Sequence, residues 1–245
     1  MNNYKILTEY VGSKFNGWQK QGNTKNTIQE KFENILFELT GENIEIHASG
    51  RTDAGVHAKG QVANFKTLKE YSCEYLKEYF NKYLPNDIKV LSAQKVQERF
   101  HARLNAKKKT YEYKIANAEK PSVFEHKFCC YIQERLNVGE MIKASEYFLG
   151  KHDFKAFCSN KRYKKSTVRE IFDINITETD NMISIKICGN GFLHNMVRII
   201  SGTLVEVGLG KIKAESIPQI LKSQVRENAG YTMPPQGLTL LNVEY

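Results

Sequence analysis

The sequence predicts an α+β fold built from two ferredoxin-like halves, each with the element order β-α-β-β-α-β. In the N-terminal part, two segments carry apolar residues at helical spacing, and strand-like alternating segments flank them. A similar order of elements recurs after residue 108, although no sequence identity between the halves is evident. With a boundary in the stretch 99–108, we predict an N-terminal half over residues 1–103 and a C-terminal half over residues 108–245.

The elements of the first half follow from local signals. Residues 4–11 carry strand-forming side chains. Thr27, followed three residues later by Glu30, predicts the start of a helix, and Gly41 is placed to end it. The remaining predicted elements are strands at 43–49 and 61–66, a helical stripe over 75–83 that stops before Pro85, and a strand at 88–96.

The second half repeats this arrangement with longer elements. A strand is predicted at 109–116 and a helix at 138–149, ending at Gly150. The pair Asp180-Asn181 predicts the turn of a β-hairpin. The other predicted elements are hairpin strands at 168–178 and 182–188, helices at 192–206 and 215–222, and a strand at 238–244.

Composition and charge narrow the class of protein. The 245 residues include 36 Lys and Arg against 27 Asp and Glu, a net charge of +9, which favours a polyanionic partner. No apolar run is long enough to span a membrane, and the first ten residues lack the apolar core of a signal peptide. The five cysteines show no C-x-x-C spacing. We therefore expect a reduced cytoplasmic protein without disulfides or structural zinc.

The stretch from Ala48 to Ala58 is the most informative feature of the chain. It places one carboxylate, Asp53, among small residues, with Arg51 two positions before it and a glycine on either side. Glycine allows a close backbone approach or a positive φ, so such a loop can present a single acid to a substrate. A plain β-turn, in which Asp53 and Gly55 serve only the turn geometry, explains the same composition.

The segment SGRTDAGVHA, residues 49–58, closely resembles the catalytic loop of the tRNA pseudouridine synthase A family. Further fragments that resemble the family pattern follow in the same order along nearly the whole chain: Glu9-Tyr10-Val11-Gly12-Ser13, Gly17-Trp18-Gln19, Thr27-Ile28-Gln29, Phe100-His101-Ala102-Arg103, Lys109-Thr110-Tyr111-Glu112-Tyr113, His152-Asp153-Phe154, Ala156-Phe157-Cys158, Phe192-Leu193-His194-Asn195-Met196-Val197-Arg198 and Gly237-Leu238. One departure is Met233, where the family usually has a small residue.

The resemblance implies a fold and a set of site residues. It implies that the two halves join into one mostly antiparallel sheet with helices on one face and an active-site cleft between the halves. It assigns Asp53 as the catalytic nucleophile, Tyr111 as the active-site tyrosine and Arg198 as the ion-pair partner of Asp53. It also implies a homodimer that modifies tRNA uridines at positions thirty-eight, thirty-nine and forty of the anticodon stem-loop.

The chemistry of this reaction needs few groups. Pseudouridine formation breaks the bond between C1′ and N1 of uridine and rejoins the base through C5, without redox change or added atoms, so no cofactor is expected. A carboxylate can attack as a nucleophile or remove a proton from the sugar, and the sequence leaves both routes open. Arg51 is the alternative ion-pair partner of Asp53, although we assign it to extrusion of the target nucleotide or contact with phosphate.

Other residues are candidates for RNA contact. His57 and the lysines Lys107, Lys108 and Lys109 are assigned to substrate binding, and the basic run 161–165 is a further candidate for the RNA backbone. The histidines show no metal-ligand spacing, so no metal is expected. Two other classes compete with the synthase: an RNA-binding folding helper that has lost catalysis, and a metal nuclease, which usually needs several converging carboxylates.

Overall fold

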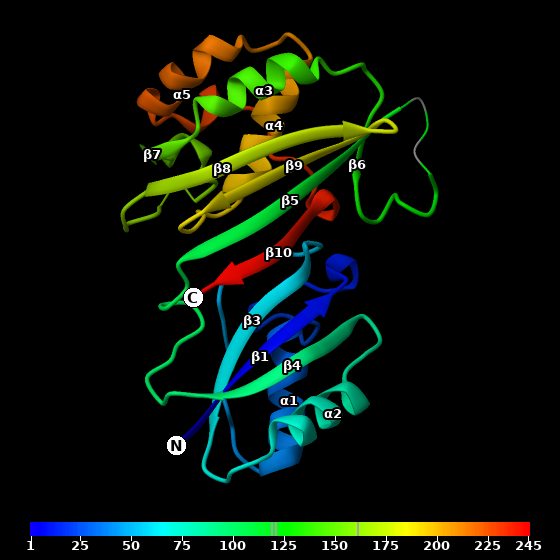
Figure 1. Ribbon diagram of the computed structural model, residues 1–245, viewed down its shortest axis with the longest axis vertical. Coiled ribbons are helices and arrows are strands. Elements are labelled where there is room, and N and C mark those ends of the chain that lie inside the picture. The colour runs from blue at the N-terminus through cyan, green and yellow to red at the C-terminus, as the bar shows by residue number, and fades with distance from the viewer. Residues whose placement is uncertain (119, 121, 161) are drawn as a thin grey trace. The chain divides into compact units, whose positions relative to one another are not determined.

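The computed structural model describes residues 1–118, 120, 122–160 and 162–245. The chain forms two compact units, one containing Met1–Lys107 with Thr239–Tyr245, the other Lys108–Leu238 (Figure 1). Within the described residues there are five α-helices, and most of the strand pairs are antiparallel, which confirms the α+β fold class. Short 3-10 helices lie at Gly12–Lys14, Lys155–Phe157, Ala214–Ser216, Arg226–Asn228 and Pro235–Gly237.

The first unit has the predicted order β-α-β-β-α-β. Its strands are β1 (Asn2–Tyr10), β2 (His47–Ala48), β3 (His57–Thr67) and β4 (Ile88–Val96). Strand β1 pairs antiparallel with both β3 and β4, and β2 pairs antiparallel with β3. The predicted strand 43–49 is therefore reduced to two residues, whereas 61–66 belongs to a strand of eleven.

The last strand, β10 (Leu238–Glu244), pairs in parallel with β3 through Thr239↔His57 and Leu240↔Ala58. An added Cβ at Gly60 of β3 would lie 2.2 Å from the Leu241 carbonyl oxygen, so glycine permits the close approach of the two backbones. The sequence assigned 238–244 to the second half, whereas Thr239–Tyr245 group with the first unit. The residues paired in this parallel contact are far apart in the sequence, so no local sequence pattern predicts it.

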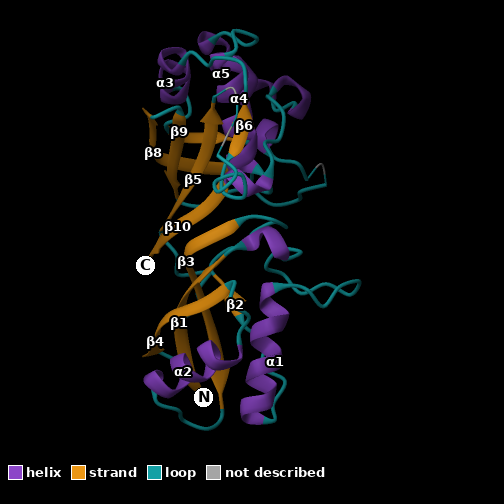
Figure 2. Ribbon diagram, turned by 90° about the vertical axis from the view of Figure 1, so that its right-hand side faces the viewer, coloured by secondary structure: helices purple, strands orange, loops and turns teal. Residues whose placement is uncertain are grey.

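Two helices cover one face of the first sheet, α1 (Ile28–Thr40) and α2 (Cys73–Tyr83) (Figure 2). The Thr27 hydroxyl accepts a hydrogen bond from the Glu30 amide, and Gly41 ends α1 with φ 72°, as predicted. Phe80 of α2 packs on both Phe32 of α1 and Phe65 of β3. These aromatic contacts form the centre of the core of this unit.

The predicted apolar stripe of α2 is only partly buried. Leu76 and Phe80 face the core, but Tyr75, Tyr79 and Tyr83 line a more exposed side of the helix, where their rings contact one another at tilted angles. Tyrosine has an apolar ring and a polar tip, so it fits either a core or a wet surface. Helical spacing alone therefore overestimated the buried face of α2.

The second unit contains the strands β5 (Lys108–Asn117), β6 (Cys130–Ile132), β7 (Gly150–Asp153), β8 (Val168–Thr179) and β9 (Met182–Gly189). The sheet runs β5-β9-β8-β7 with antiparallel neighbours, and β6 pairs in parallel with β5. Asp180 and Asn181, with φ 49° and 63°, form the tight turn between β8 and β9, which confirms the predicted hairpin.

Three helices pack in this unit: α3 (Val138–Glu146), α4 (Met196–Gly208) and α5 (Ile217–Ser223). Most of α4 is buried, including the small residues Ser201 and Gly202. The sequence predicted that α4 begins near 192, but Asn195 has the left-handed φ of 61° and precedes the first helical residue, Met196. The segment before it is an irregular loop that belongs to the candidate site.

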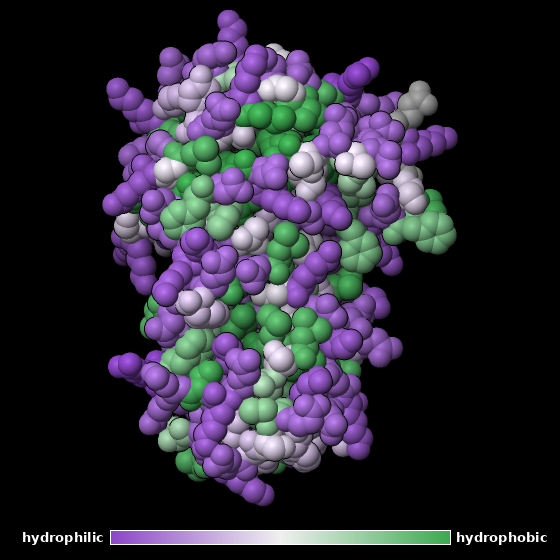
Figure 3. Space-filling view, in the orientation of Figure 1, coloured by the Kyte–Doolittle hydropathy of each residue, from purple (hydrophilic) through white to green (hydrophobic). Residues whose placement is uncertain are grey.

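Hydrophilic side chains dominate the face of the molecule shown in Figure 3, and hydrophobic ones appear there as small separate patches. None of the helices in the described ranges is both long and apolar enough to cross a membrane. The five cysteines are free thiols, of which Cys129, Cys130 and Cys158 are buried.

Candidate active site

The Asp53 loop, residues 49–56, connects β2 to β3 in the first unit. Two glycines near the N-terminus let the chain pack directly on this loop. An added Cβ would lie 1.9 Å from the Val56 carbonyl oxygen at Gly12, and 2.8 Å from the Thr52 carbonyl oxygen at Gly17, where φ is +88°. Any other residue at Gly12 or Gly17 would displace the loop. The close approach explains why both glycines stand in the N-terminal fragments that resemble the family.

Buried hydrogen bonds fix the backbone on both sides of Asp53. The Ser49 hydroxyl donates to Gln61 Oε1 at 2.7 Å, and Gln61 Nε2 donates to the Gly50 carbonyl oxygen at 2.9 Å. The hydroxyls of Tyr10 and Thr52 are 2.8 Å apart, and Gln61 Nε2 also reaches the Tyr10 hydroxyl at 3.3 Å. A loop held by such a network presents its side chains in one geometry.

The backbone of the loop is also held directly. The Trp18 amide donates to the Thr52 carbonyl oxygen at 3.0 Å, and the Val56 amide donates to the Asp53 carbonyl oxygen at 3.1 Å. Trp18 itself is buried between Tyr10 and Phe32, so it packs in the core beside the loop. The Asp53 side chain is half-buried, so its carboxylate remains accessible from a rigid loop.

Arg51 and His57 flank Asp53 in different environments. Arg51 is exposed, and among the described residues it forms no ion pair with Asp53, although only two positions separate them. His57 is buried, and its Nδ1 accepts a hydrogen bond from the Gly12 amide at 3.1 Å. This bond places the proton of the neutral ring on Nε2. It gives His57 a part in holding the loop, while its contact with RNA stays a prediction.

Tyr111 lies on β5 of the second unit, opposite Ile187 of β9. Its ring is largely buried and meets the ring of Phe192 edge to face, with centroids 5.2 Å apart and an interplanar angle of 87°. Tyr113, on the same face of the strand, is fully buried, and its hydroxyl donates to the Pro234 carbonyl oxygen at 2.7 Å. Tyr113 is therefore a core residue, and Tyr111 is buried beside it with 8% of its surface exposed.

Arg198 lies in the first turn of α4, and its guanidinium is held in place by neutral groups. Nε donates to the Met233 carbonyl oxygen at 2.6 Å, and Nη1 donates to Asn195 Oδ1 at 2.7 Å. Asn195 is in turn anchored by a bond from its Nδ2 to the Ser159 hydroxyl at 2.9 Å. These contacts orient the planar group without neutralising its charge.

The segment around Met233 runs along α4 at close range. An added Cβ at Gly202 would lie 1.9 Å from the Tyr231 carbonyl oxygen, and the Gly230 amide donates to the Thr203 hydroxyl at 2.9 Å. The Met233 side chain is fully buried in this contact. Met233 therefore fills the interior beside α4, and its backbone carbonyl positions Arg198.

The lysine run lies at the junction of the two units. Lys107 and Lys108 are exposed and Lys109 is half-exposed at the start of β5. The Lys107 amide donates to the Glu244 carbonyl oxygen at 2.8 Å, and the Lys108 ammonium lies 5.4 Å from the centre of the Phe172 ring.

Asp53, Arg51 and His57 belong to the first unit, whereas Tyr111 and Arg198 belong to the second. That they share one cleft stays a prediction. The supporting residues Tyr10, Gln61 and Phe192 were not predicted, because their contacts join distant parts of the sequence. Asn195 lies in the motif 192–198 before Arg198, and this was the one available signal for it.

In the described ranges, no three His, Cys, Asp or Glu residues are grouped as a metal would require.

Comparison with known proteins places this arrangement in a family. Residues 6–105 and 144–245 match the sequence model of a family described as tRNA pseudouridine synthase. Asp53 and Arg198 fall inside the matched ranges, whereas Tyr111 and the lysine run lie between them.

Curated relatives are similar along the full length. The chain is 47% identical to "tRNA pseudouridine synthase A 2" of Bacillus cereus (strain ZK / E33L) over 245 residues, covering 100% of both chains. It is 49% identical to "tRNA pseudouridine synthase A" of Bacillus sp. (strain KSM-64) over 231 residues, covering 94% of this chain and 95% of the relative. Identity to the protein of that name from Acetivibrio thermocellus is 44% over 245 residues.

Proposed function

The chain belongs to the tRNA pseudouridine synthase family, and we propose that it isomerises uridine to pseudouridine in the anticodon stem-loop of tRNA, at positions thirty-eight, thirty-nine and forty, with Asp53 as the catalytic nucleophile or base. Members of this family are isomerases. The target positions come from the resemblance of the sequence to the family. The role of Asp53 rests on the loop that carries it.

The observation that carries the proposal is a single carboxylate on a loop that cannot relax. Gly12 and Gly17 bring two backbone segments against the loop, and the hydrogen bonds of Tyr10 and Gln61 fix it from within. Such a loop holds the Asp53 carboxylate at one place relative to the C1′ atom of a bound uridine. Fixed placement of the reacting group is among the largest contributions to catalysis. The group has already lost its conformational freedom when the protein folds, so this entropy is not lost again in the transition state.

Arg198 supports Asp53 in this proposal as its cationic partner. A cation in the first turn of a helix is disfavoured by the helix dipole by roughly 0.3–1 kcal/mol, and Arg198 is the third residue of α4. Asn195 and Met233 orient the guanidinium through hydrogen bonds to neutral oxygens, and a guanidinium fixed in this way suits a carboxylate.

Tyr111 supplies an aromatic face for the target base. The edge of one ring on the face of the other fixes the relative orientation of Tyr111 and Phe192. Stacking on an aromatic face tolerates rotation of the base better than directional hydrogen bonds do, and the base must turn between cleavage and rejoining. Tyr111 therefore binds the substrate in our proposal.

The remaining assignments concern RNA binding and assembly. Arg51 extrudes the target nucleotide or contacts a phosphate, and His57 with Lys107, Lys108 and Lys109 contributes to holding the RNA. A net charge of +9 suits a polyanion such as tRNA. We further propose a homodimer in the cytoplasm, on the strength of the resemblance to the family, which the particle mass of the active species tests.

The test is the change Asp53→Asn, which removes the charge and keeps nearly the same shape. We expect no pseudouridine in a tRNA transcript treated with this variant, whereas tRNA affinity stays within a few-fold of the wild type. Asp180→Asn, the same chemical change in the exposed turn between β8 and β9, serves as the control and keeps full activity.

Pseudouridine is mapped by position along the transcript, so the same experiment tests the target uridines. Turnover of Asp53→Asn at even about a tenth of the wild-type rate would remove Asp53 from the chemistry. A wild-type protein that binds tRNA and forms no pseudouridine would instead be an RNA-binding helper.

A further inference from the structure

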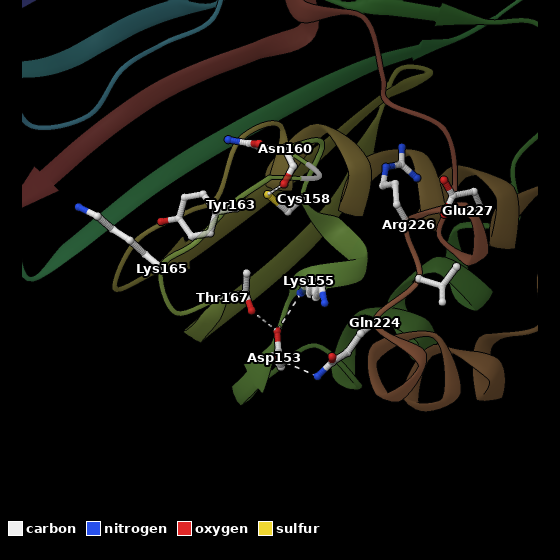
Figure 4. Close-up of a pocket in the computed structure, with 11 residues that line it drawn as sticks. Asp153, Lys155, Cys158, Asn160, Tyr163, Lys165, Thr167, Gln224, Arg226 and Glu227 are labelled. Atoms are coloured by element: carbon white, nitrogen blue, oxygen red, sulfur yellow. Dashed lines mark hydrogen bonds between the residues drawn. The ribbon is translucent and has the colours of Figure 1, made fainter.

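A concave pocket lies in the second unit, between residues of the segments 153–160 and 163–167 and the turn 224–227 that follows α5 (Figure 4). Its volume is about 490 Å³, within the range of roughly 300–1,000 Å³ that is common for small-molecule sites. Neither Asp53, Tyr111 nor Arg198 lines it, whereas Tyr163 and Lys165 belong to the basic run 161–165 that the sequence marked as a candidate for RNA contact. The residues that line it are Asp153, Lys155, Cys158, Asn160, Tyr163, Lys165, Thr167, Gln224, Val225, Arg226 and Glu227.

Three cationic side chains stand around this pocket. Lys155 and Lys165 are exposed, and no carboxylate in the described ranges lies within ion-pair distance of either ammonium group. Figure 4 shows Lys165 on one side of the pocket, Arg226 on the other and Lys155 between them. Cations placed on separate walls suit a charged strand that passes between them better than one compact anion.

Arg226 is a preorganised cation. Its Nη1 donates to the carbonyl oxygens of Ala229 and Gly230 at 3.2 and 2.9 Å, and its Nη2 donates to the Thr232 hydroxyl at 3.0 Å. All three acceptors are neutral; burial lowers the pKa of the guanidinium, and the carboxylates of Glu227 and Glu206 offset only part of this effect. A nearby anion would offset this desolvation, and the group needs no reorientation to receive one.

The carboxylate of Asp153 builds the pocket. Oδ1 accepts from the Lys155 amide at 3.0 Å and from the Thr167 hydroxyl at 2.5 Å, while Oδ2 accepts from Gln224 Nε2 at 2.9 Å. These three bonds tie the end of β7 to the segment before β8 and to the end of α5. The acid thus joins the walls, and it repels an incoming anion less than a free carboxylate would because its oxygens are already hydrogen-bonded.

An aromatic ring completes the site. Tyr163 stands beside Lys165 in Figure 4, and its hydroxyl accepts from Arg169 Nη2 at 3.2 Å, which fixes the direction of the ring. Cations alternating with an aromatic face are the groups that bind a nucleic-acid strand, the cations at its phosphates and the ring at a base.

We propose that this pocket is a second RNA-binding site, which takes a segment of the phosphodiester backbone of the tRNA substrate with Lys155, Lys165 and Arg226 at phosphates and the Tyr163 ring against one base. The proposal rests on the proposed function for the identity of the RNA. It adds a binding surface that neither the catalytic loop nor the lysine run at 107–109 supplies.

The experiment compares two double variants that each remove two positive charges from the second unit. Lys155→Gln with Lys165→Gln alters the pocket, and Lys211→Gln with Lys213→Gln alters exposed lysines elsewhere. Binding of a tRNA transcript is measured between roughly 50 and 200 mM salt. We expect the pocket variant to flatten the slope of log K against log salt by about 1.4–1.8, which corresponds to two lost phosphate contacts, and to weaken binding on the order of tenfold.

The ring is tested in the same assay. We expect Tyr163→Ala to weaken tRNA binding on the order of tenfold, and Tyr163→Phe, which keeps the aromatic face, to bind like the wild type.

A pocket variant whose salt slope equals that of the Lys211/Lys213 control would overturn the proposal. Equal binding by Tyr163→Ala and Tyr163→Phe would remove the ring from the RNA path. Because the readout is binding, its result is separate from the proposed function: a wild-type protein without synthase activity would refute the function and leave the comparison of salt slopes intact.

Discussion

The guanidinium of Arg198 shows how one side chain is prepared by its neighbours. Its Nε and Nη1 donate to two fixed oxygens in different parts of the second unit, at Met233 and Asn195. A lysine at this position keeps the charge but has one ammonium group in place of the planar fork, so it cannot reproduce both contacts in the same geometry. The residue therefore carries geometry as well as charge.

We accordingly expect Arg198→Lys to lower turnover on tRNA by a factor of about ten to a hundred, with a much smaller change in tRNA affinity. Arg51→Lys, at an exposed position, is the matched comparison, and we expect it to raise KM more than it lowers kcat. Single-turnover kinetics on a tRNA transcript separates the two effects. A near wild-type Arg198→Lys beside an inactive Arg51→Lys would exchange the two assignments.

At the residue scale, the sequence predicts the role of a side chain when that side chain belongs to a contiguous motif. Asp53 is visible because it is the one acid in a run of small residues. Tyr10 and Gln61, which hold its loop, are 51 positions apart and belong to different strands, so no local pattern joins them. The sequence therefore identified the candidate catalytic acid but missed the residues that keep it in place.

Elements are predicted well where the chain carries an explicit start or stop. Thr27 and Gly41 bound α1 as expected, and the Asp180-Asn181 turn forms its hairpin. Prediction failed at the start of α4, where the sequence assigned residues 192–195 to the helix but the backbone is left-handed at Asn195. The contacts of Asn195 with Arg198 and Ser159 override the local preference for helix.

At the level of elements, a glycine at a positive φ can end a helix or allow another backbone segment to come close. Substitution by alanine distinguishes these two roles. Gly41 ends α1 at φ +72° with no atom within 4 Å of an added Cβ, whereas the Cβ of Gly17→Ala would lie 2.8 Å from the Thr52 carbonyl oxygen. We expect Gly41→Ala to lower the free energy of unfolding by about 1–2 kcal/mol without changing kcat.

Gly17→Ala bears the same backbone strain and also displaces the Asp53 loop. We expect a larger loss of stability and a fall in kcat on the order of tenfold or more, because a misplaced catalytic group reacts slowly. Urea unfolding and turnover on tRNA are measured for both variants. If Gly17→Ala keeps the kcat of Gly41→Ala, the close approach of Gly17 does not position the loop.

At the scale of the whole molecule, buried tyrosines in both units make folding sensitive to alkaline pH. Burial raises the pKa of Tyr10 in the first unit to about 12, and burial also raises the pKa of Tyr113 in the second. The unfolded chain releases these protons near pH 10. The stability gained from keeping Tyr10 neutral is thus complete below pH 10 and is lost as pH rises from 10 to about 12, in total by about 3 kcal/mol.

The variant Tyr10→Phe has no proton to lose, so its stability should depend less on pH than that of the wild type. Near neutral pH we expect it to be less stable by about 1–2 kcal/mol, because its hydroxyl no longer bonds Thr52 and Gln61. Between about pH 9 and pH 11 this difference in stability should shrink by about 1.4 kcal/mol. Over this range Tyr10 ionises in the unfolded wild-type chain, which stabilises the unfolded state relative to the folded one. Urea unfolding at several pH values measures it, with Tyr83→Phe, at an exposed position of α2, as the control. A constant difference between wild type and Tyr10→Phe would show that the Tyr10 hydroxyl ionises as readily in the folded protein as in the unfolded chain, and that the hydrogen bonds around the Asp53 loop do not depend on its proton.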